Sequence, residues 1–251
     1  MKRSEFHSLF NCSGPVILPV IHVKSKEQTI KNVEKIIQAN VSGCFLINHD
    51  FDVDQFIPII CETRVLYPSF WIGVNFLGVT GLDAFPILSA MSDAGTRIDA
   101  YWADDARINE RSIFQEEAEA IRNSYAESNW AGLYFGGTAF KKQRPVSEKD
   151  FATAAEIAGN YTDVVTTSGI ATGTAADLQK ITTFRAALPD TPLALASGIT
   201  PENARKYRMV DCFMVATGIN IEHDFYQIDS KKLKQLVAVS KRLGSDNDKN
   251  Q

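Results

Sequence analysis

Three turns in the last third of the chain place a hydroxyl residue and a glycine directly after an apolar run. These turns are Ser168 with Gly169, Ser197 with Gly198, and Thr217 with Gly218. Glycine lets the backbone approach an anion closely, and the N–H groups at the start of a following helix point toward negative charge. The last two turns are therefore candidates for binding a phosphate group. The alternative is that their glycines only permit tight turns between strand and helix.

Three residues at the ends of other apolar runs could move a proton or orient a ligand. His22 is a candidate general acid or base because imidazole titrates near neutral pH, although a histidine after an apolar strand is also commonly structural. Asp104 is a candidate base, while Asp104 and Asp105 could equally be solvated or helix-capping carboxylates. Asn75 is polar in an otherwise apolar run, which favours a ligand contact. The predicted catalytic residues are His22, Asp104 and Asn75.

Further ligand contacts are predicted beside these groups. Asn48 and His49 are adjacent, and adjacent strand residues point to opposite sides, so only one of them faces the ligand. Lys141 belongs to a glycine-started loop that also carries Lys142 and Arg144, and this loop is either a clamp for an anion or an ordinary solvated basic loop. The sequence has no His, Cys, Asp or Glu spacing typical of a metal site, so neither metal nor cofactor is predicted. The predicted additional ligand residues are Asn48, Thr167, Ser168, Gly169 and Lys141.

These residues must be positioned by an alternating series of strands and helices. Apolar runs of strand length cover residues 15–23, 43–48, 70–75, 98–102, 130–135, 161–167, 192–196 and 211–216. Helical patterns follow at a segment capped by Ser25 and at residues 53–66, 82–93, 112–128, 148–158, 175–188, 201–208 and 230–242. Within 112–128, the residues expected to contact the core are Ile113, Ala120, Ile121 and Tyr125.

Eight strand–helix repeats in 251 residues predict a parallel sheet closed into a single (β/α)8 TIM barrel. An open doubly wound sheet is the competitor, but it would carry its phosphate-binding glycines after the first strand, where residues 22–25 contain none. In such a barrel, strand ends converge at one mouth, where the chemistry is done. The barrel domain is predicted over residues 1–244, with a polar, fraying tail at 245–251.

Composition excludes several classes of protein. The chain is 45% hydrophobic and 22% charged with a net charge of −4, which argues against nucleic acid as a partner because a basic face is absent. No apolar run reaches membrane-spanning length, and residues 1–5 do not begin a signal peptide, so a cytoplasmic protein is expected. The four cysteines show no paired spacing and are expected to be reduced.

At several of these segments the chain resembles the BtpA/SgcQ family of barrels. The similarity is carried by residues 19–22, 73–77, 163–173, 196–203 and 211–218, and it covers most of the chain. The resemblance implies a ribulose-phosphate-binding-like barrel with a phosphorylated small-molecule ligand. The chain departs from the family at Ala196, which replaces a glycine, and after Gly218, where a lysine is missing. It also departs at the ends of the fourth and fifth strands, so catalytic roles do not carry over.

Two functions follow from the sequence. The first is an enzyme acting on a sugar phosphate or phosphoribosyl compound, as an isomerase, lyase or transferase. Because no predicted strand contains a lysine, an aldolase that forms a Schiff base is disfavoured. The second is a non-catalytic assembly factor or phosphate-ligand sensor on a degenerate barrel. The expected partner is a small phosphorylated molecule. A homo-oligomer formed through the outer helices fits the pattern, although no feature sets the number of subunits.

Overall fold

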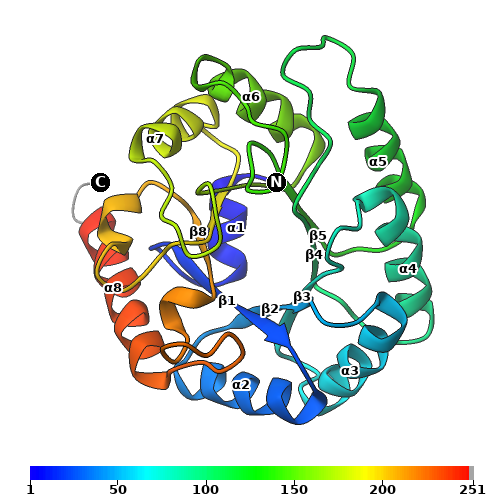
Figure 1. The fold of residues 1–251 in the computed structure, drawn as a ribbon, viewed down its shortest axis with the longest axis vertical. Coiled ribbons are helices and arrows are strands. Elements are labelled where there is room, and N and C mark those ends of the chain that lie inside the picture. The colour runs from blue at the N-terminus through cyan, green and yellow to red at the C-terminus, as the bar shows by residue number, and fades with distance from the viewer. Residues whose placement is uncertain (249–251) are drawn as a thin grey trace.

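The computed structural model describes residues 1–248, and within them eight parallel strands close into a barrel in sequence order (Figure 1). Strand β1 pairs with both β2 and β8, which completes the ring. The fold class predicted from the eight repeats is thereby confirmed. The strands are β1 (Val16–Val23), β2 (Gly43–Asn48), β3 (Trp71–Asn75), β4 (Ala100–Ala103), β5 (Leu133–Gly137), β6 (Val164–Ser168), β7 (Leu193–Ala196) and β8 (Cys212–Val215).

The helices form an outer layer around this ring (Figure 1). They are α2 (Lys26–Gln38), α3 (Val53–Leu66), α4 (Gly81–Asp93), α5 (Glu116–Glu127), α6 (Phe151–Tyr161), α7 (Leu178–Ala187) and α8 (Ser230–Asp248), with 3₁₀ turns η1 (Glu148–Asp150), η2 (Ala204–Tyr207) and η3 (Thr217–Ile219). The predicted cap of α2 is present, since Ser25 accepts a hydrogen bond from the Gln28 N–H.

The structure corrects three helix predictions. Helix α5 begins at Glu116 rather than residue 112, because residues 104–115 form a long loop, and this leaves Ile113 fully outside the core at 95% exposure and Ala120 exposed as well. The segment after Pro201 forms turns and the short η2 instead of an α-helix. Helix α8 continues to Asp248 through most of the predicted tail, and the rest of that tail lies outside the described residues.

Two apolar layers explain why the strands are buried on both faces. One layer packs outward-facing strand residues such as Leu46, Val74 and Val165 against the helices. The other fills the barrel itself with Leu18, Phe45 and other inward-facing residues. Because successive strand residues alternate in direction, His22, Asn75 and Trp102 belong to the inward series of their strands.

An N-terminal helix that the sequence patterns did not indicate, α1 (Arg3–Leu9), closes the end of the barrel opposite the mouth (Figure 1). Its Phe6 and Phe10 join the barrel-filling cluster, and Phe6 lies 6.1 Å from Phe135 between ring centroids. Asp211, just before β8, accepts hydrogen bonds from Arg3 and His7 at 2.9 Å each. The helix therefore seals the bottom and leaves one open end.

Candidate active site

The carboxyl ends of the strands surround a narrow cavity of about 40 Å³ at the barrel mouth, space for roughly three water molecules. In a barrel of this type the loops after the strands carry the chemistry. The polar residues lining the cavity are His22, His49, Trp102, Asp104, Lys141, Lys142, Thr172, Ser197 and Thr217. The mouth thus brings together two of the three predicted catalytic residues and both hydroxyls of the predicted phosphate site.

Asp104 and Asn75 form a hydrogen-bonded pair at this mouth. Asn75 follows the inward series of β3 and donates from Nδ2 to Oδ1 of Asp104 at 3.2 Å. Burial raises the pKa of Asp104 above its usual range, and the nearby Lys141 and the Asn75 hydrogen bond only partly offset this effect. A carboxyl with a raised pKa can hold a proton closer to neutral pH, as a general acid requires.

His22 and His49, which come from the ends of the neighbouring strands β1 and β2, stack face to face at the mouth. Their ring centroids are 4.7 Å apart with 5° between the planes, and Phe225 lies edge-on to His22 at 3.8 Å. Burial, together with the charges of His49 and Lys141, lowers the pKa of His22 to about 3. The pKa of His49 is also lowered, mainly by burial. Both imidazoles are therefore neutral at pH 7, which suits hydrogen bonding more than proton donation from an imidazolium.

Two buried polar atoms at the mouth have no partner among residues 1–248. They are Nδ1 of His22 and the indole Nε1 of Trp102, in side chains that are 7% and 4% exposed. Leaving a buried donor unpaired costs about 1–3 kcal/mol. Both residues line the mouth cavity. A bound ligand that accepts a hydrogen bond from the Trp102 indole N–H would therefore remove the cost of leaving that donor unpaired.

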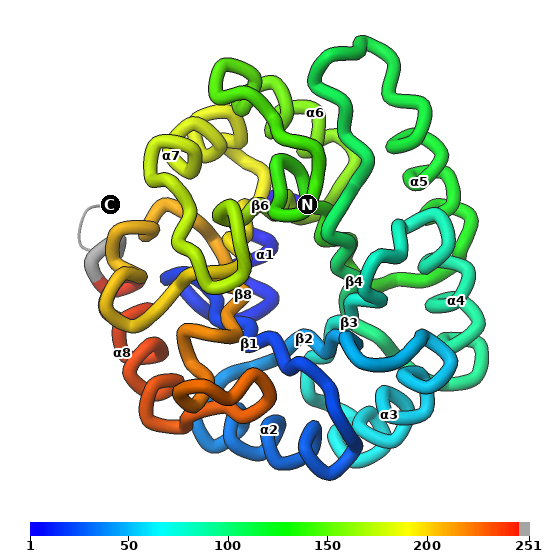
Figure 2. The backbone as a smooth tube through the Cα atoms, viewed as in Figure 1, coloured from blue at the N-terminus to red at the C-terminus, as the bar shows by residue number. Residues whose placement is uncertain are grey.

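Two lysines from the β5–α6 loop supply positive charge. This loop and the β6–α7 loop both fold inward over the ring of strands (Figure 2). Lys141 is partly buried, and Lys142 is exposed at the edge of the cavity. The sequence left open whether this loop is a clamp or solvated surface, and in the structure its first lysine belongs to the mouth.

A larger cavity of about 630 Å³ lies beside the mouth, between the same two loops and the starts of α6 and α7. Its volume is typical of a small-molecule pocket. The unpaired atoms of His22 and Trp102 and the Asp104 carboxyl with its raised pKa, however, lie at the narrower mouth. Lys141 and Lys142 line both cavities, so a ligand with one group in the mouth has room beyond them. Ser168 and Gly169, predicted as ligand contacts, line this larger cavity.

The glycines of the predicted phosphate turns are packed against neighbouring loops. A Cβ at Gly198 would lie 2.4 Å from the backbone N of Ala175, and one at Gly218 would lie 1.8 Å from the carbonyl oxygen of Ile199. The loops can pack this closely only because neither position carries a side chain. Ser197 and Thr217, in contrast, line the mouth cavity, and the Ser197 hydroxyl also donates to the Thr174 carbonyl at 3.5 Å.

Two other predicted ligand residues have partners within the protein. Asn48 donates to the Phe51 carbonyl at 2.8 Å and accepts from the Leu77 N–H at 3.0 Å, so it holds loops together while His49 faces the mouth. Thr167 is fully buried and donates to the Ala139 carbonyl at 3.3 Å. Neither lines the two cavities described above.

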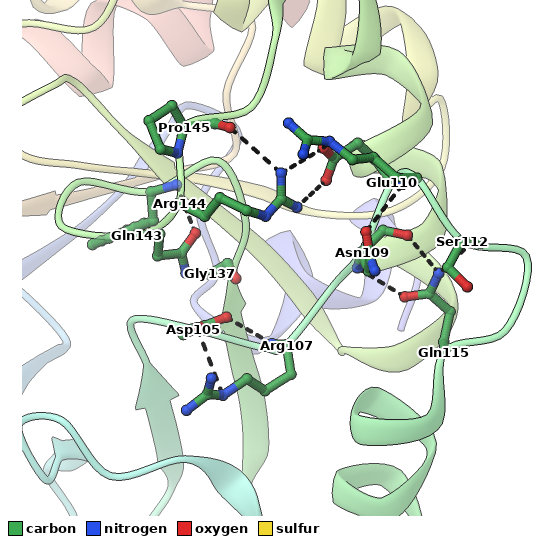
Figure 3. A network of polar contacts seen from close by, with 12 residues as sticks. Asp105, Arg107, Asn109, Glu110, Ser112, Gln115, Gly137, Gln143, Arg144 and Pro145 are labelled. Atoms are coloured by element: carbon green, nitrogen blue, oxygen red, sulfur yellow. Dashed lines mark hydrogen bonds and ion pairs between the residues drawn. The ribbon is translucent and has the colours of Figure 1, made fainter.

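The β4–α5 and β5–α6 loops are tied together at the rim (Figure 3). Arg144 donates from Nη1 to Oε1 of Glu110 at 2.8 Å and from Nη2 to Oε2 of the same carboxylate. Gln143 donates to the backbone oxygens of Asp104 and Gly137. Arg144 is thus committed to a structural pair, and Gln143 fixes the Asp104 backbone next to Lys141.

The site residues predicted from the sequence did not include Trp102, Thr172 or Phe225, whereas His49 and Lys142 were among the alternatives left open. Trp102 and His49 were recognisable as strand-end residues, but nothing local marks Trp102 as orphaned or His49 as stacked on His22. Phe225 reaches His22 from the loop before α8, about two hundred residues along the chain. Within residues 1–248, no three His, Cys, Asp or Glu side chains come together as metal ligands would.

Fold and site define a (β/α)8 barrel with a polar, lysine-bearing mouth at the carboxyl ends of its strands. A model of the BtpA family matches residues 59–242. This range covers most of the chain, so the chain belongs to the BtpA family. A comparison with curated proteins finds no match. No helix within residues 1–248 is long and apolar enough to cross a membrane.

Solved structures share the fold at low sequence identity. The chain is similar to tryptophan synthase subunit alpha from Legionella pneumophila, with a TM-score of 0.64, 13% identity and coverage of 98% of this chain and 99% of the other. It is also similar to phosphoribosyl anthranilate isomerase from Thermus thermophilus, with a TM-score of 0.58, 15% identity, and coverage of 92% and 98%. The native KDPGal structure gives a TM-score of 0.62 at 12% identity, with coverage of 91% and 96%.

Proposed function

We propose that this chain is an enzyme acting on a small phosphorylated compound, such as a sugar phosphate or phosphoribosyl derivative, bound at the barrel mouth. The observation that carries the proposal is the convergence there of unpaired buried polar atoms, a carboxyl with a raised pKa and two lysines. Such a set orients a polar anion and moves a proton near the reacting carbon. The phosphoribosyl ligand in the name of one fold neighbour supports the same ligand class.

The proposed roles follow from position. The mouth cavity takes one phosphoryl-sized group, bound by the hydroxyls of Ser197 and Thr217 and the charge of Lys142. The carbon chain then passes Lys141 into the larger cavity. Asp104, oriented by Asn75, is the acid or base of the reaction. In this proposal the phosphate is bound by the hydroxyl residues Ser197 and Thr217, and the neighbouring glycines Gly198 and Gly218 do not contact it.

A thermal-shift panel tests the binding site. Inorganic phosphate, sugar phosphates, phosphoribosyl compounds and nucleotides are added to wild type, Lys142→Met and Thr217→Val. We expect one phosphorylated class to raise the Tm of wild type, since a ligand at 100 times its Kd stabilises by about 2.7 kcal/mol. The shift should shrink strongly in both variants.

The matched control is Lys149→Met, which removes an exposed lysine eight residues from Lys141 and outside both cavities. It should retain the wild-type shift. No shift with any compound, or equal shifts in wild type and Lys142→Met, would reject the phosphate site.

A second candidate is the non-catalytic sensor or assembly factor. The β4–α5 loop presents Ile113 and Phe114, which are 95% and 78% exposed. Exposed apolar side chains of this size are typical of interaction sites. Phosphorus NMR separates the candidates: consumption of the compound that raises Tm supports the enzyme, and tight binding without consumption supports the sensor.

A further inference from the structure

The loop that carries Lys141 is held in a strained conformation by a dense set of hydrogen bonds. Ala139 and Lys142, on either side of it, have positive φ values of 46° and 64°. Such backbone costs of order 1–3 kcal/mol per residue and persists where the surroundings enforce it. The enforcing contacts come from β6, where the Ser168 hydroxyl accepts from the Lys141 N–H at 2.8 Å, and from Lys180, which donates to the Ala139 carbonyl.

Two partly buried lysines in this region have different partners. Lys180 donates from Nζ to the Ser168 carbonyl at 2.9 Å as well as to Ala139, so its amine is occupied in fixing the loop. Nζ of Lys141 has no hydrogen-bond or ion-pair partner among residues 1–248. Lys180 is therefore a positioning residue, and Lys141 presents an available amine between the two cavities.

The surroundings of Lys141 lower the pKa of its amine. Burial lowers its pKa, Lys142 lowers it further, and Asp104 opposes the shift. The Asp104 carboxyl has a raised pKa in the same cavity. A lysine with a lowered pKa is a nucleophile toward carbonyl carbon, and a carboxylic acid beside it can protonate a leaving hydroxyl.

We propose that Lys141 forms an imine with the carbonyl group of a small phosphorylated aldehyde or ketone. The proposal rests on the proposed function, whose substrate class it narrows to carbonyl compounds. Among residues 1–248, none of the eight strands carries a lysine, so in this proposal the reactive lysine lies on the β5–α6 loop instead.

The step balances with the residues present. The amine nitrogen of Lys141 bonds to the carbonyl carbon and gives up one proton while the carbonyl oxygen gains one, forming a carbinolamine. The acid form of Asp104 protonates the new hydroxyl, the C–O bond breaks and water leaves. The products are a protonated imine on Lys141 and the Asp104 carboxylate, and neither oxidant nor reductant is consumed.

Reductive trapping tests the proposal. Wild type is incubated with glycolaldehyde phosphate and sodium cyanoborohydride at pH 7.5, and peptide mass spectrometry locates the secondary amine. We expect Lys141 to be labelled faster than exposed Lys234, because a lowered pKa leaves more of the Lys141 amine in the free form that attacks a carbonyl. Glycolaldehyde without phosphate should label Lys141 more slowly.

The decisive variant is Lys141→Arg, which keeps the positive charge but forms no imine, with Lys149→Arg as its control. Fast labelling should vanish in the first and persist in the second. Labelling of Lys141 no faster than Lys234, or preferential labelling of Lys142, would overturn the proposal. A normal phosphate Tm shift without labelling would reject the imine alone, whereas fast labelling of Lys141 without any phosphate shift would reject the phosphate site and keep the nucleophile.

Discussion

At the scale of single residues, surroundings decide what a histidine of this chain can do. His22 is 7% exposed and its pKa is lowered to about 3, whereas His223 projects into solvent beside Glu222. His22 stays neutral through the whole range in which an ordinary imidazole gains its proton. Its role at the mouth is therefore that of a neutral hydrogen-bonding ring stacked on His49.

This burial predicts a pH-dependent stability. The unfolded chain protonates His22 below its ordinary pKa of 6.5, but the folded protein does not until about pH 3, so stability is present above pH 6.5 and is lost as the pH falls. Between pH 7 and pH 5 the loss from His22 is about 2 kcal/mol. Urea unfolding at both pH values should show that much less pH dependence in His22→Gln than in wild type. His223→Gln should keep the wild-type dependence, and an unchanged difference in His22→Gln would contradict the prediction.

At the scale of elements, α1 acts as the floor of the barrel. Burial alone would raise the pKa of Asp211, but hydrogen bonds from His7 and the Leu193 N–H and the charges of Arg3 and Arg185 lower it below its usual range. The carboxylate thereby joins α1 to the starts of β7 and β8. The opposite end of the barrel remains the only open one among the described elements.

Removing the aromatic contact of α1 should destabilise the whole barrel. Phe6 is fully buried against Phe10 and Phe135, so Phe6→Ala is expected to lower the free energy of unfolding by about 3–5 kcal/mol through the cavity it leaves. Leu9→Ala, on the exposed side of the same helix at 52% exposure, should change it by less than about 0.5 kcal/mol. Chemical denaturation measures both, and equal losses would show that α1 is not part of the core.

At the scale of the whole molecule, closure of the ring depends on filling its interior without excess volume. Phe45 projects from β2 across the face of β3, where Gly73 leaves space for its ring; a Cβ at Gly73 would lie 2.3 Å from the ring. Large and small side chains thus alternate between neighbouring strands, as expected in a filled barrel.

Gly73→Ala should therefore overpack the barrel. We expect a loss of about 1–3 kcal/mol in the free energy of unfolding, because the interior must shift to admit one methyl group. In the Phe45→Leu background the same substitution should cost clearly less, since the colliding ring is gone. A double-mutant cycle from urea titrations gives the coupling energy, and additive effects would argue against this contact.

The sequence by itself was sufficient for the succession of eight strands and for the location of the mouth, although not for every helix between them. Eight runs such as residues 43–48 are continuous in apolar character because both faces are buried, and the order of such runs requires a parallel, closed arrangement. Polar residues after these runs, including His22 and Asp104, had to lie at the same end because parallel strands end together.

Only the tertiary structure decided which of these side chains act together. Asn48 and His49 are indistinguishable by local pattern, and the choice between them is made by Leu77 and Phe51, which bind Asn48. The floor helix is fixed by Arg3 and Asp211, 208 residues apart, and the direction of Lys141 by Lys180, which holds Ala139 from 41 residues away. Local sequence sets the spacing of apolar residues along each strand and helix and the residues that cap the helices. The burial that shifts pKa values, and the contacts that occupy Lys180 while the Lys141 amine has no partner among residues 1–248, arise only when segments distant in the sequence pack together.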